Sequence, residues 1–127
     1  MDMKLELVPL PVTDVEISKA FYVDKVGFHL DHDVRPGNGM RIIQLTPPGS
    51  ACSIVFGTGM GDANPPGSIR NLHLVVGNIS EARKMLDEKG VEISEIQDMG
   101  GVQYAYFADP DGNSWALQEI SSRPQSM

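Results

Sequence analysis

The residues of this chain that could do acid–base or hydrogen-bonding chemistry gather in two segments of its second half. The segment NLHLVV carries Asn71 and His73, and the segment QYAYFADPDGNSWALQE carries Tyr104, Tyr106 and Gln118. An imidazole can donate, accept or transfer a proton near neutral pH, and amides and phenols can hold a neutral molecule beside it. We interpret His73 as a candidate ligand contact and, secondarily, as a candidate catalytic acid–base. The plainer alternative is a strand histidine satisfied by a backbone group or by water.

Strand alternation places these side chains on one face of a predicted sheet. In the strand that follows residue 70, the odd-numbered residues share one face, and three even-numbered apolar residues share the face that helices must cover. If Phe107 and Trp115 also point toward the helices, their neighbours in the last hairpin point to the open side. The open face then contains Asn71, His73, Tyr104, Tyr106, Ala116 and Gln118.

The predicted elements belong to an internal duplication, which is the strongest pattern in the sequence. Residues 5–28 match residues 69–91, and residues 39–57 match residues 101–120, each with one gap. Two copies of a unit that cannot bury its own sheet face are expected to pack together.

Each half predicts a strand, a helix and three further strands. Asp14 and Asn78 are the expected helix N-caps, and Gly27 and Gly90 are the expected helix ends. The predicted fold class is therefore α+β, with two β-α-β-β-β modules in one chain, each a curved mixed sheet with a helix on its convex face. We treat residues 1–127 as one domain, with module one at about 4–57, a linker at about 58–68, module two at about 69–120 and a tail at 121–127.

By the repeat, Leu7, Pro9, Ser53 and Val55 share the corresponding open face of module one. Pro9 and Pro11 lack N–H donors on the same side of the first strand, so that strand is expected to lie at a sheet edge. A concave face that mixes apolar, aromatic and neutral polar side chains is typical of a small-molecule cavity.

Composition narrows the classes of partner. The formal net charge of −7 disfavours nucleic acids and anionic membranes, and no segment is long or apolar enough to span a bilayer. The start, MDMKLELVPL, has no pattern of a signal peptide, so we expect a cytoplasmic protein. The single cysteine, Cys52, excludes an intramolecular disulfide and a thiolate metal cluster.

Three features together resemble the vicinal oxygen chelate superfamily: the two β-α-β-β-β halves, the segment KAFYVDKVGF after the first strand, and the segment DPDGN before the last strand. That group includes glyoxalase I, bleomycin-resistance proteins, fosfomycin-resistance enzymes and extradiol dioxygenases. The resemblance spans about residues 4–120. It implies a homodimer and a cavity closed by paired modules, which pair either within one chain or between the two subunits.

The resemblance also implies where the enzymes of this superfamily bind a divalent ion. The four corresponding positions are Leu7, Ser53, Asn71 and Ala116, and none is His, Glu, Asp or Cys. Such a set offers no anionic or imidazole donor to a divalent ion. The chain is therefore similar to the metal-free members, which bind and sequester a ligand, and we expect neither metal nor other cofactor.

Three functions remain open at this stage, beside a pure interaction module whose concave face is filled by its own side chains. The first is a metal-free protein that binds a small, partly apolar organic molecule. The second is a metal-free lyase or isomerase that uses His73 with Tyr104 or Gln118 as acid–base groups. The third is a metal-dependent glyoxalase-like or dioxygenase-like enzyme with relocated ligands, which rests on the resemblance alone.

The remaining polar candidates are interpreted as surface residues. His29 and His32 are three apart on a predicted strand and are expected on opposite faces, so they should not chelate one ion. Asp31, Asp33 and Arg35 are expected on a solvated rim near the edge of the second strand. Glu119 is expected on the face opposite Ala116 unless a bulge shifts the register.

Overall fold

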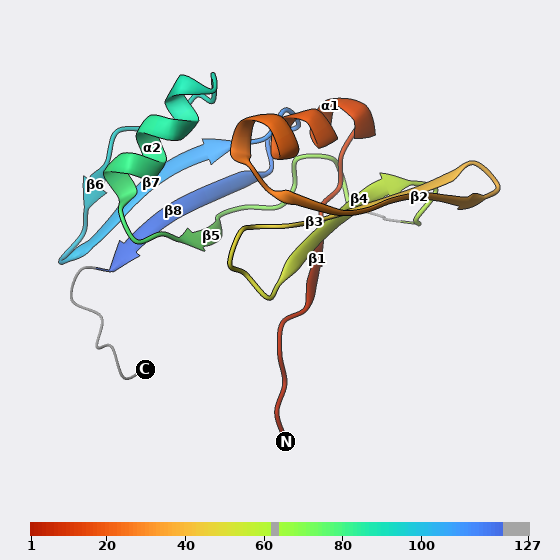
Figure 1. The fold of residues 1–127 in the computed structure, drawn as a ribbon, viewed down its shortest axis with the longest axis horizontal. Helices are drawn as coiled ribbons and strands as arrows, with labels where there is room; N and C mark the ends of the chain where they lie inside the picture. Colours follow the sequence, from red (N-terminus) through yellow and green to blue (C-terminus); the bar gives the residue numbers. More distant parts are fainter. Residues whose placement is uncertain (62–63, 121–127) are drawn as a thin grey trace.

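Two four-stranded sheets lie beneath two helices in the computed structural model, which describes residues 1–61 and 64–120 (Figure 1). The strand orders are β1-β4-β3-β2 and β5-β8-β7-β6, so each module repeats one topology and the predicted α+β fold class is confirmed. The predicted tail at 121–127 lies outside the described residues.

The first module contains β1 (Leu7–Pro9), α1 (Val15–Ala20), its π-helical continuation η1 (Phe21–Val26), β2 (His29–Gly37), β3 (Met40–Thr46) and β4 (Ser53–Thr58). The second contains β5 (Leu72–Val75), α2 (Ile79–Glu88), β6 (Gln97–Asp98), β7 (Val102–Ala108) and β8 (Ser114–Ile120).

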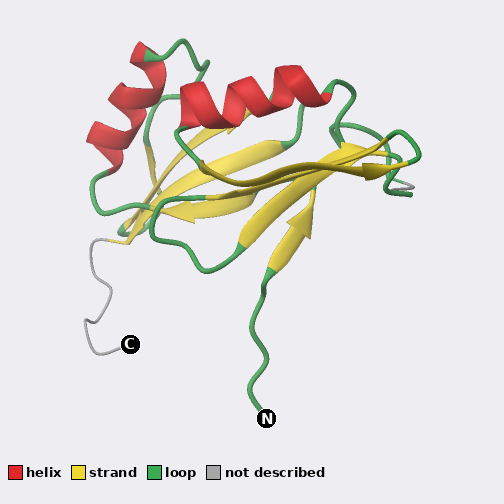
Figure 2. Ribbon diagram, turned by 45° about the vertical axis from the view of Figure 1, so that its right-hand side comes forward, coloured by secondary structure: helices red, strands yellow, loops and turns green. Residues whose placement is uncertain are grey.

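The edge position predicted for the first strand is confirmed. Within the described residues, β1 pairs in parallel with β4 alone and β5 pairs in parallel with β8 alone, so each of these two strands lies at an edge of its sheet. The residues that precede β1 extend away from the body of the protein (Figure 2).

Helix ends fall where the sequence predicts them. Asp14 accepts hydrogen bonds from the backbone N–H groups of Glu16 and Ile17, and Asn78 accepts one from that of Glu81. Each helix is followed by a glycine in the left-handed conformation that this residue tolerates best. Within residues 1–61 and 64–120, none of the helices has the length and apolar character needed to cross a membrane.

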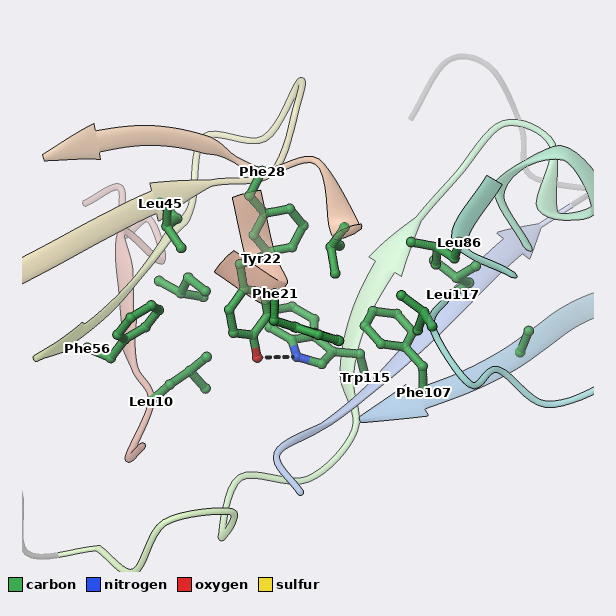
Figure 3. Close-up of a cluster of buried hydrophobic side chains, with 14 of the residues drawn as sticks. Leu10, Phe21, Tyr22, Phe28, Leu45, Phe56, Leu86, Phe107, Trp115 and Leu117 are labelled. Carbon is green, nitrogen blue, oxygen red and sulfur yellow. Dashed lines mark hydrogen bonds between the residues drawn. The ribbon is translucent and has the colours of Figure 1, made fainter. Parts of the chain in front are cut away.

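One aromatic core joins the two modules. The ring of Tyr22, fully buried in η1, lies 5.8 Å from that of Trp115 in β8, and Phe21 lies 6.4 Å from Phe107 in β7 (Figure 3). The first helix thus covers its own sheet and also packs on the sheet of the other module. The sequence predicts the burial of Phe107 and Trp115 correctly, but it does not single out Tyr22.

The DPDGN segment, which connects β7 to β8, stabilises this core through hydrogen bonds. Asp109 is 5% exposed, and its carboxylate accepts hydrogen bonds from the Tyr22 hydroxyl, the Asn113 side-chain amide and the backbone N–H groups of Asp111 and Asn113. The Trp115 indole N–H donates to the Tyr22 oxygen at 2.9 Å. Burial and the nearby Asp109 carboxylate raise the pKa of the Tyr22 hydroxyl well above its usual range. The turn therefore has a structural role that needs no metal.

Candidate functional site

Each sheet has one face that points away from the helices (Figure 2), and strand pairing assigns the predicted site residues other than Asn71 to these open faces. Strand β4 lies between β1 and β3, and strand β8 lies between β5 and β7. Side chains on one face therefore line up in rows across each sheet. In module one the paired rows are Leu7–Ser53–Thr46–His29 and Pro9–Val55–Gln44–His32. In module two they are His73–Ala116–Tyr106 and Val75–Gln118–Tyr104.

The open face of module two brings four of the predicted polar and aromatic residues together. His73 Nδ1 lies 2.5 Å from Gln118 Oε1, and the His73 ring meets the Tyr104 ring edge-on at 5.9 Å. The rings of Tyr104 and Tyr106 are nearly parallel, with centroids 6.2 Å apart. Beneath them Ala116 is fully buried, so the small side chain leaves room for the rings above it.

This contact fixes the hydrogen-bonding direction of the face. The Gln118 oxygen can only accept, so His73 Nδ1 carries the proton and donates. In the neutral ring Nε2 is then an acceptor, and the Gln118 amide nitrogen remains a donor. Together with the two tyrosine hydroxyls, the face offers both donors and acceptors next to aromatic surface, which suits an organic ligand.

Asn71 does not occupy the position that the repeat predicts. It precedes β5 with a φ of 56°, and its backbone N–H donates to Ser114 Oγ at 2.8 Å. His73, not Asn71, pairs with Ala116, as Leu7 pairs with Ser53. The connection from β5 to the Asn78 cap is shorter than the corresponding connection from β1 to Asp14, so counting back from the caps misplaces the match by two residues.

The open face of module one is polar in a way that the sequence does not predict. A bulge between Leu30 and His32 adds one residue to β2 and turns Asp31 toward this face. His29 pairs with Thr46 and His32 with Gln44, so both histidines lie on the same face. The prediction of opposite faces is wrong because it assumed strict alternation, which the bulge interrupts.

Asp31 and Asp33 are also not the solvated rim that the sequence indicates. Asp31 accepts hydrogen bonds from the side chains of Thr46 and Gln44 on the open face. Asp33 lies on the helix side, where Arg41 and Lys19 donate to it at 2.8 Å and 2.7 Å. Hydrogen bonds from Arg41 and then Lys19 hold the pKa of the Asp33 carboxyl well below its usual range. Glu16 is the other partner of Arg41.

Glu119 lies on the face opposite Ala116, as predicted. Its carboxylate accepts a hydrogen bond from the backbone N–H of Ile79 at 2.7 Å, at the first turn of α2. The negative charge thus stabilises a helix N-terminus and points away from the open face.

The donors present do not fit a divalent ion at the positions that the resemblance indicates. The row partners there are Leu7 with Ser53 and His73 with Ala116, so the only nitrogen donor is an imidazole whose Nδ1 is engaged by Gln118. Across residues 1–61 and 64–120 no group of three or more histidine, cysteine, aspartate or glutamate side chains is arranged to hold a metal ion. A single imidazole gives too few ligands for a stable zinc or transition-metal site.

Two hollows of about 520 Å³ each lie at the edges of the sheets, beside β1 and beside β5. One lies beside Pro9 and Val55, where the segment after β4 crosses the end of β1. The other follows the open edge of β5 from His73 to Val76, between the β3–β4 turn and α2. The His73–Tyr104–Tyr106 surface itself is open in a single chain.

Sequence reasoning placed most of the open-face residues but missed the polar centre of module one. Alternation through RIIQLT would have placed Gln44 and Thr46 beside Val55 and Ser53. The position of Asp31 could not be predicted in this way, because the residues around it do not indicate a β-bulge.

Three comparisons place the chain among known proteins. A family model described as the Glyoxalase/Bleomycin resistance protein/Dioxygenase superfamily matches residues 4–117. The protein YwkD of Bacillus subtilis (strain 168), described as uncharacterized, is 32% identical over 110 residues, which cover 78% of this chain and 83% of YwkD.

Solved structures show the same relationship. TnmS3, an antibiotic binding protein from Streptomyces sp. CB03234, is 35% identical with a TM-score of 0.84, and the match covers 94% of this chain and 98% of that one. A superfamily member from Sphaerobacter thermophilus DSM 20745 is 30% identical with a TM-score of 0.79, covering 93% and 98%.

Proposed function

Because the chain belongs to the glyoxalase/bleomycin resistance protein/dioxygenase superfamily, we propose that it is a metal-free binding protein for a small, partly apolar organic molecule. The observation that carries the proposal is the open face of module two. There His73 and Gln118 form a fixed donor–acceptor pair beside Tyr104 and Tyr106. The likeness to TnmS3, whose description is an antibiotic binding protein, supports a ligand of this kind.

The ligand should place a planar apolar group against the tyrosine rings. Aromatic surfaces prefer offset-stacked or edge-on contacts, and the Tyr104 and Tyr106 rings offer both. A hydroxyl of the ligand can then donate to His73 Nε2 or accept from the Gln118 amide. Leu7, Pro9, Ser53 and Val55 of module one form a second surface that we assign to the same class of ligand.

The absence of a metal is part of this proposal. It rests on the donor set, since Ser53, Ala116 and Leu7 supply no strong ligand beside His73. The test is a titration with Zn²⁺, Ni²⁺ and Mn²⁺ that follows the melting temperature, with metal analysis after dialysis. The proposal expects no saturable stabilisation, and one bound ion per chain after dialysis would refute it.

We place the working unit in a homodimer. The open edges of β1 and β5 and the exposed apolar residues beside them, Leu7 and Val75, are unpaired within the described chain. A second copy would cover these edges and close the open faces. Analytical ultracentrifugation tests this directly, and a monomer at micromolar concentration would contradict it.

Binding itself can be tested with 2-naphthol, which combines a planar ring system with one hydroxyl. We expect saturable binding with NMR shifts centred on Tyr104, Tyr106 and His73. Trp115, buried under the helices, provides a control position that should not respond. Saturable binding that leaves the tyrosine signals unmoved would overturn the assignment of this face.

A metal-free lyase or isomerase is the second candidate, and one observation favours it. The Gln118 contact keeps the proton on His73 Nδ1, so Nε2 is free to act as a base. His73→Gln retains hydrogen bonding but cannot move a proton in this way. If any ligand is converted, turnover should vanish in His73→Gln while binding persists; loss of binding alone would favour the binding protein.

A further inference from the structure

A second polar centre lies on the open face of module one, separate from the tyrosine face. The β2 bulge places the Asp31 carboxylate among Gln44, Thr46 and Ser53. No lysine or arginine of the described residues forms an ion pair with Asp31. Asp33, two residues further along the strand, forms ion pairs with Lys19 and Arg41. Among the described residues, the ion pair recorded for Asp31 is with His29, whose Nε2 lies 3.7 Å from Asp31 Oδ1, beyond hydrogen-bonding distance.

The hydrogen bonds around Asp31 have a defined direction. An ionised carboxylate only accepts, so the single Thr46 hydroxyl proton goes to Asp31 Oδ2. Thr46 must then accept from Ser53, whose hydroxyl lies 2.6 Å away. The Ser53 hydroxyl proton is therefore donated to Thr46, so the Ser53 oxygen can act toward a further group only as an acceptor. Ser53 is 5% exposed, so its lone pairs are in a largely buried position.

Gln44 follows the same rule. Its amide nitrogen donates to Asp31 Oδ2 at 3.4 Å, which leaves its oxygen as an acceptor. Asp31 Oδ1 receives no hydrogen bond within the described residues. Three acceptors of one local network are therefore unused: Asp31 Oδ1, the Gln44 oxygen and the Ser53 lone pairs. An alkylammonium group has three donors and no acceptor, and it brings the positive charge that Asp31 lacks.

We propose that the Asp31–Gln44–Ser53 centre is a subsite for the protonated primary amine of a ligand. The assignment rests on the proposed binding function and names a chemical feature of its ligand. It also gives the two modules different tasks: module two holds the planar apolar part of a molecule, and module one selects for positive charge. The net charge of −7 attracts cations to the protein in general, but the direction of the bonds makes this centre specific for donors.

Two probes of equal shape test the subsite: 2-phenylethylamine, which is protonated at pH 8, and 2-phenylethanol, which is neutral. Binding is followed by NMR, with the Gln44 side-chain amide as the local reporter. We expect the amine to bind about tenfold more tightly than the alcohol, as a charge-assisted hydrogen bond predicts.

Asp31→Asn is the decisive variant. The amide oxygen can still accept from Thr46 and Gln44, but the outward atom becomes a donor, so the preference for the amine should fall to within about twofold. Asp87→Asn, on the exposed side of α2, makes the same change in net charge and should keep the preference. If Asp31→Asn does not fold, Ser53→Ala replaces it and should lower the affinity for the amine alone.

Three outcomes would overturn the subsite: equal affinities of the two probes for the natural protein, an amine preference that survives Asp31→Asn, or no binding of the amine. None of them affects 2-naphthol at the tyrosine face, so failure of the subsite is distinguishable from failure of the proposed function. If the protein instead fails to bind 2-naphthol but keeps its preference for the amine, the assignment of the tyrosine face is refuted and the amine subsite is retained.

Discussion

The covered and open faces of the same two sheets differ in how fully their polar groups are satisfied. On the covered face, Asp109 accepts four hydrogen bonds, and Asp33 is held by Arg41 and Lys19. On the open face, Asp31 Oδ1 and the Tyr104 hydroxyl have no hydrogen-bond partner in the described chain. Unused donors and acceptors are costly in a core but available to a ligand on an open surface.

This contrast explains why the DPDGN turn is present where a metal ligand is not. The turn acts on the covered side, through Asp109 and Asn113, which also bonds the backbone of Pro11 and Ile69. The position four residues after Gly112 faces the other way and is Ala116. The turn and the ligand position are therefore independent, and one can change without the other.

The largest expected effect comes from the covered face. Asp109→Ala removes the acceptor of the buried Tyr22 hydroxyl, of the buried Asn113 backbone N–H and of the partly buried Asp111 backbone N–H. We expect a loss of about 3 kcal/mol or more in the free energy of unfolding, measured by urea denaturation. Asp87→Ala on the surface of α2 is the control, expected within about 0.5 kcal/mol. A similar cost for both variants would remove the structural role assigned to the turn.

On the open face the expected effect is on binding. Tyr104→Leu keeps an apolar side chain but removes the ring that meets His73 and stacks on Tyr106. The affinity for 2-naphthol should fall about tenfold, while the free energy of unfolding should change by less than about 0.5 kcal/mol. Isothermal titration calorimetry and urea denaturation on the same sample measure both. A large loss of stability with unchanged affinity would reverse the roles given to the two faces.

A smaller effect on stability is expected at Asp33, and it depends on pH. The folded-state pKa of Asp33 is depressed, so its contribution to stability is present above the unfolded-state value of about 4 and is lost as the pH falls through the folded-state value. Asp33→Asn should therefore be less stable by about 1 kcal/mol at pH 7. Melting temperatures of the two proteins should converge toward pH 2. A gap that stays constant from pH 7 to pH 2 would show that the carboxylate charge is not responsible.

The smallest effect is expected at Asn71. Glycine adopts a positive φ readily, so Asn71→Gly should change stability by less than about 0.5 kcal/mol and 2-naphthol affinity by less than about twofold. This outcome would confirm that Asn71 serves the turn before β5. A strong loss of binding, seen in the same calorimetric titration, would return Asn71 to the ligand site.

Most of the fold could be predicted from the sequence because its signals are local. Caps at Asp14 and Asn78, alternation in the strands and the repeated halves all agree with one topology. The burial of Tyr22 was not predictable, because it depends on a hydrogen bond to Asp109 from the other module.

The candidate site was predicted less completely, for two physical reasons. A two-residue difference between modules in the connection before the helix shifted the match from His73 to Asn71. A single-residue bulge moved Asp31 and His32 relative to simple alternation. Both depend on pairing between strands, which residue order alone does not determine.

Native mass spectrometry of the protein purified gently from its source tests the central claim most directly, because it reports subunits, metal and bound organic molecule together. The account predicts a dimer that carries an organic adduct and no divalent ion. A stoichiometric metal ion retained by His73 and neighbouring side chains would contradict it.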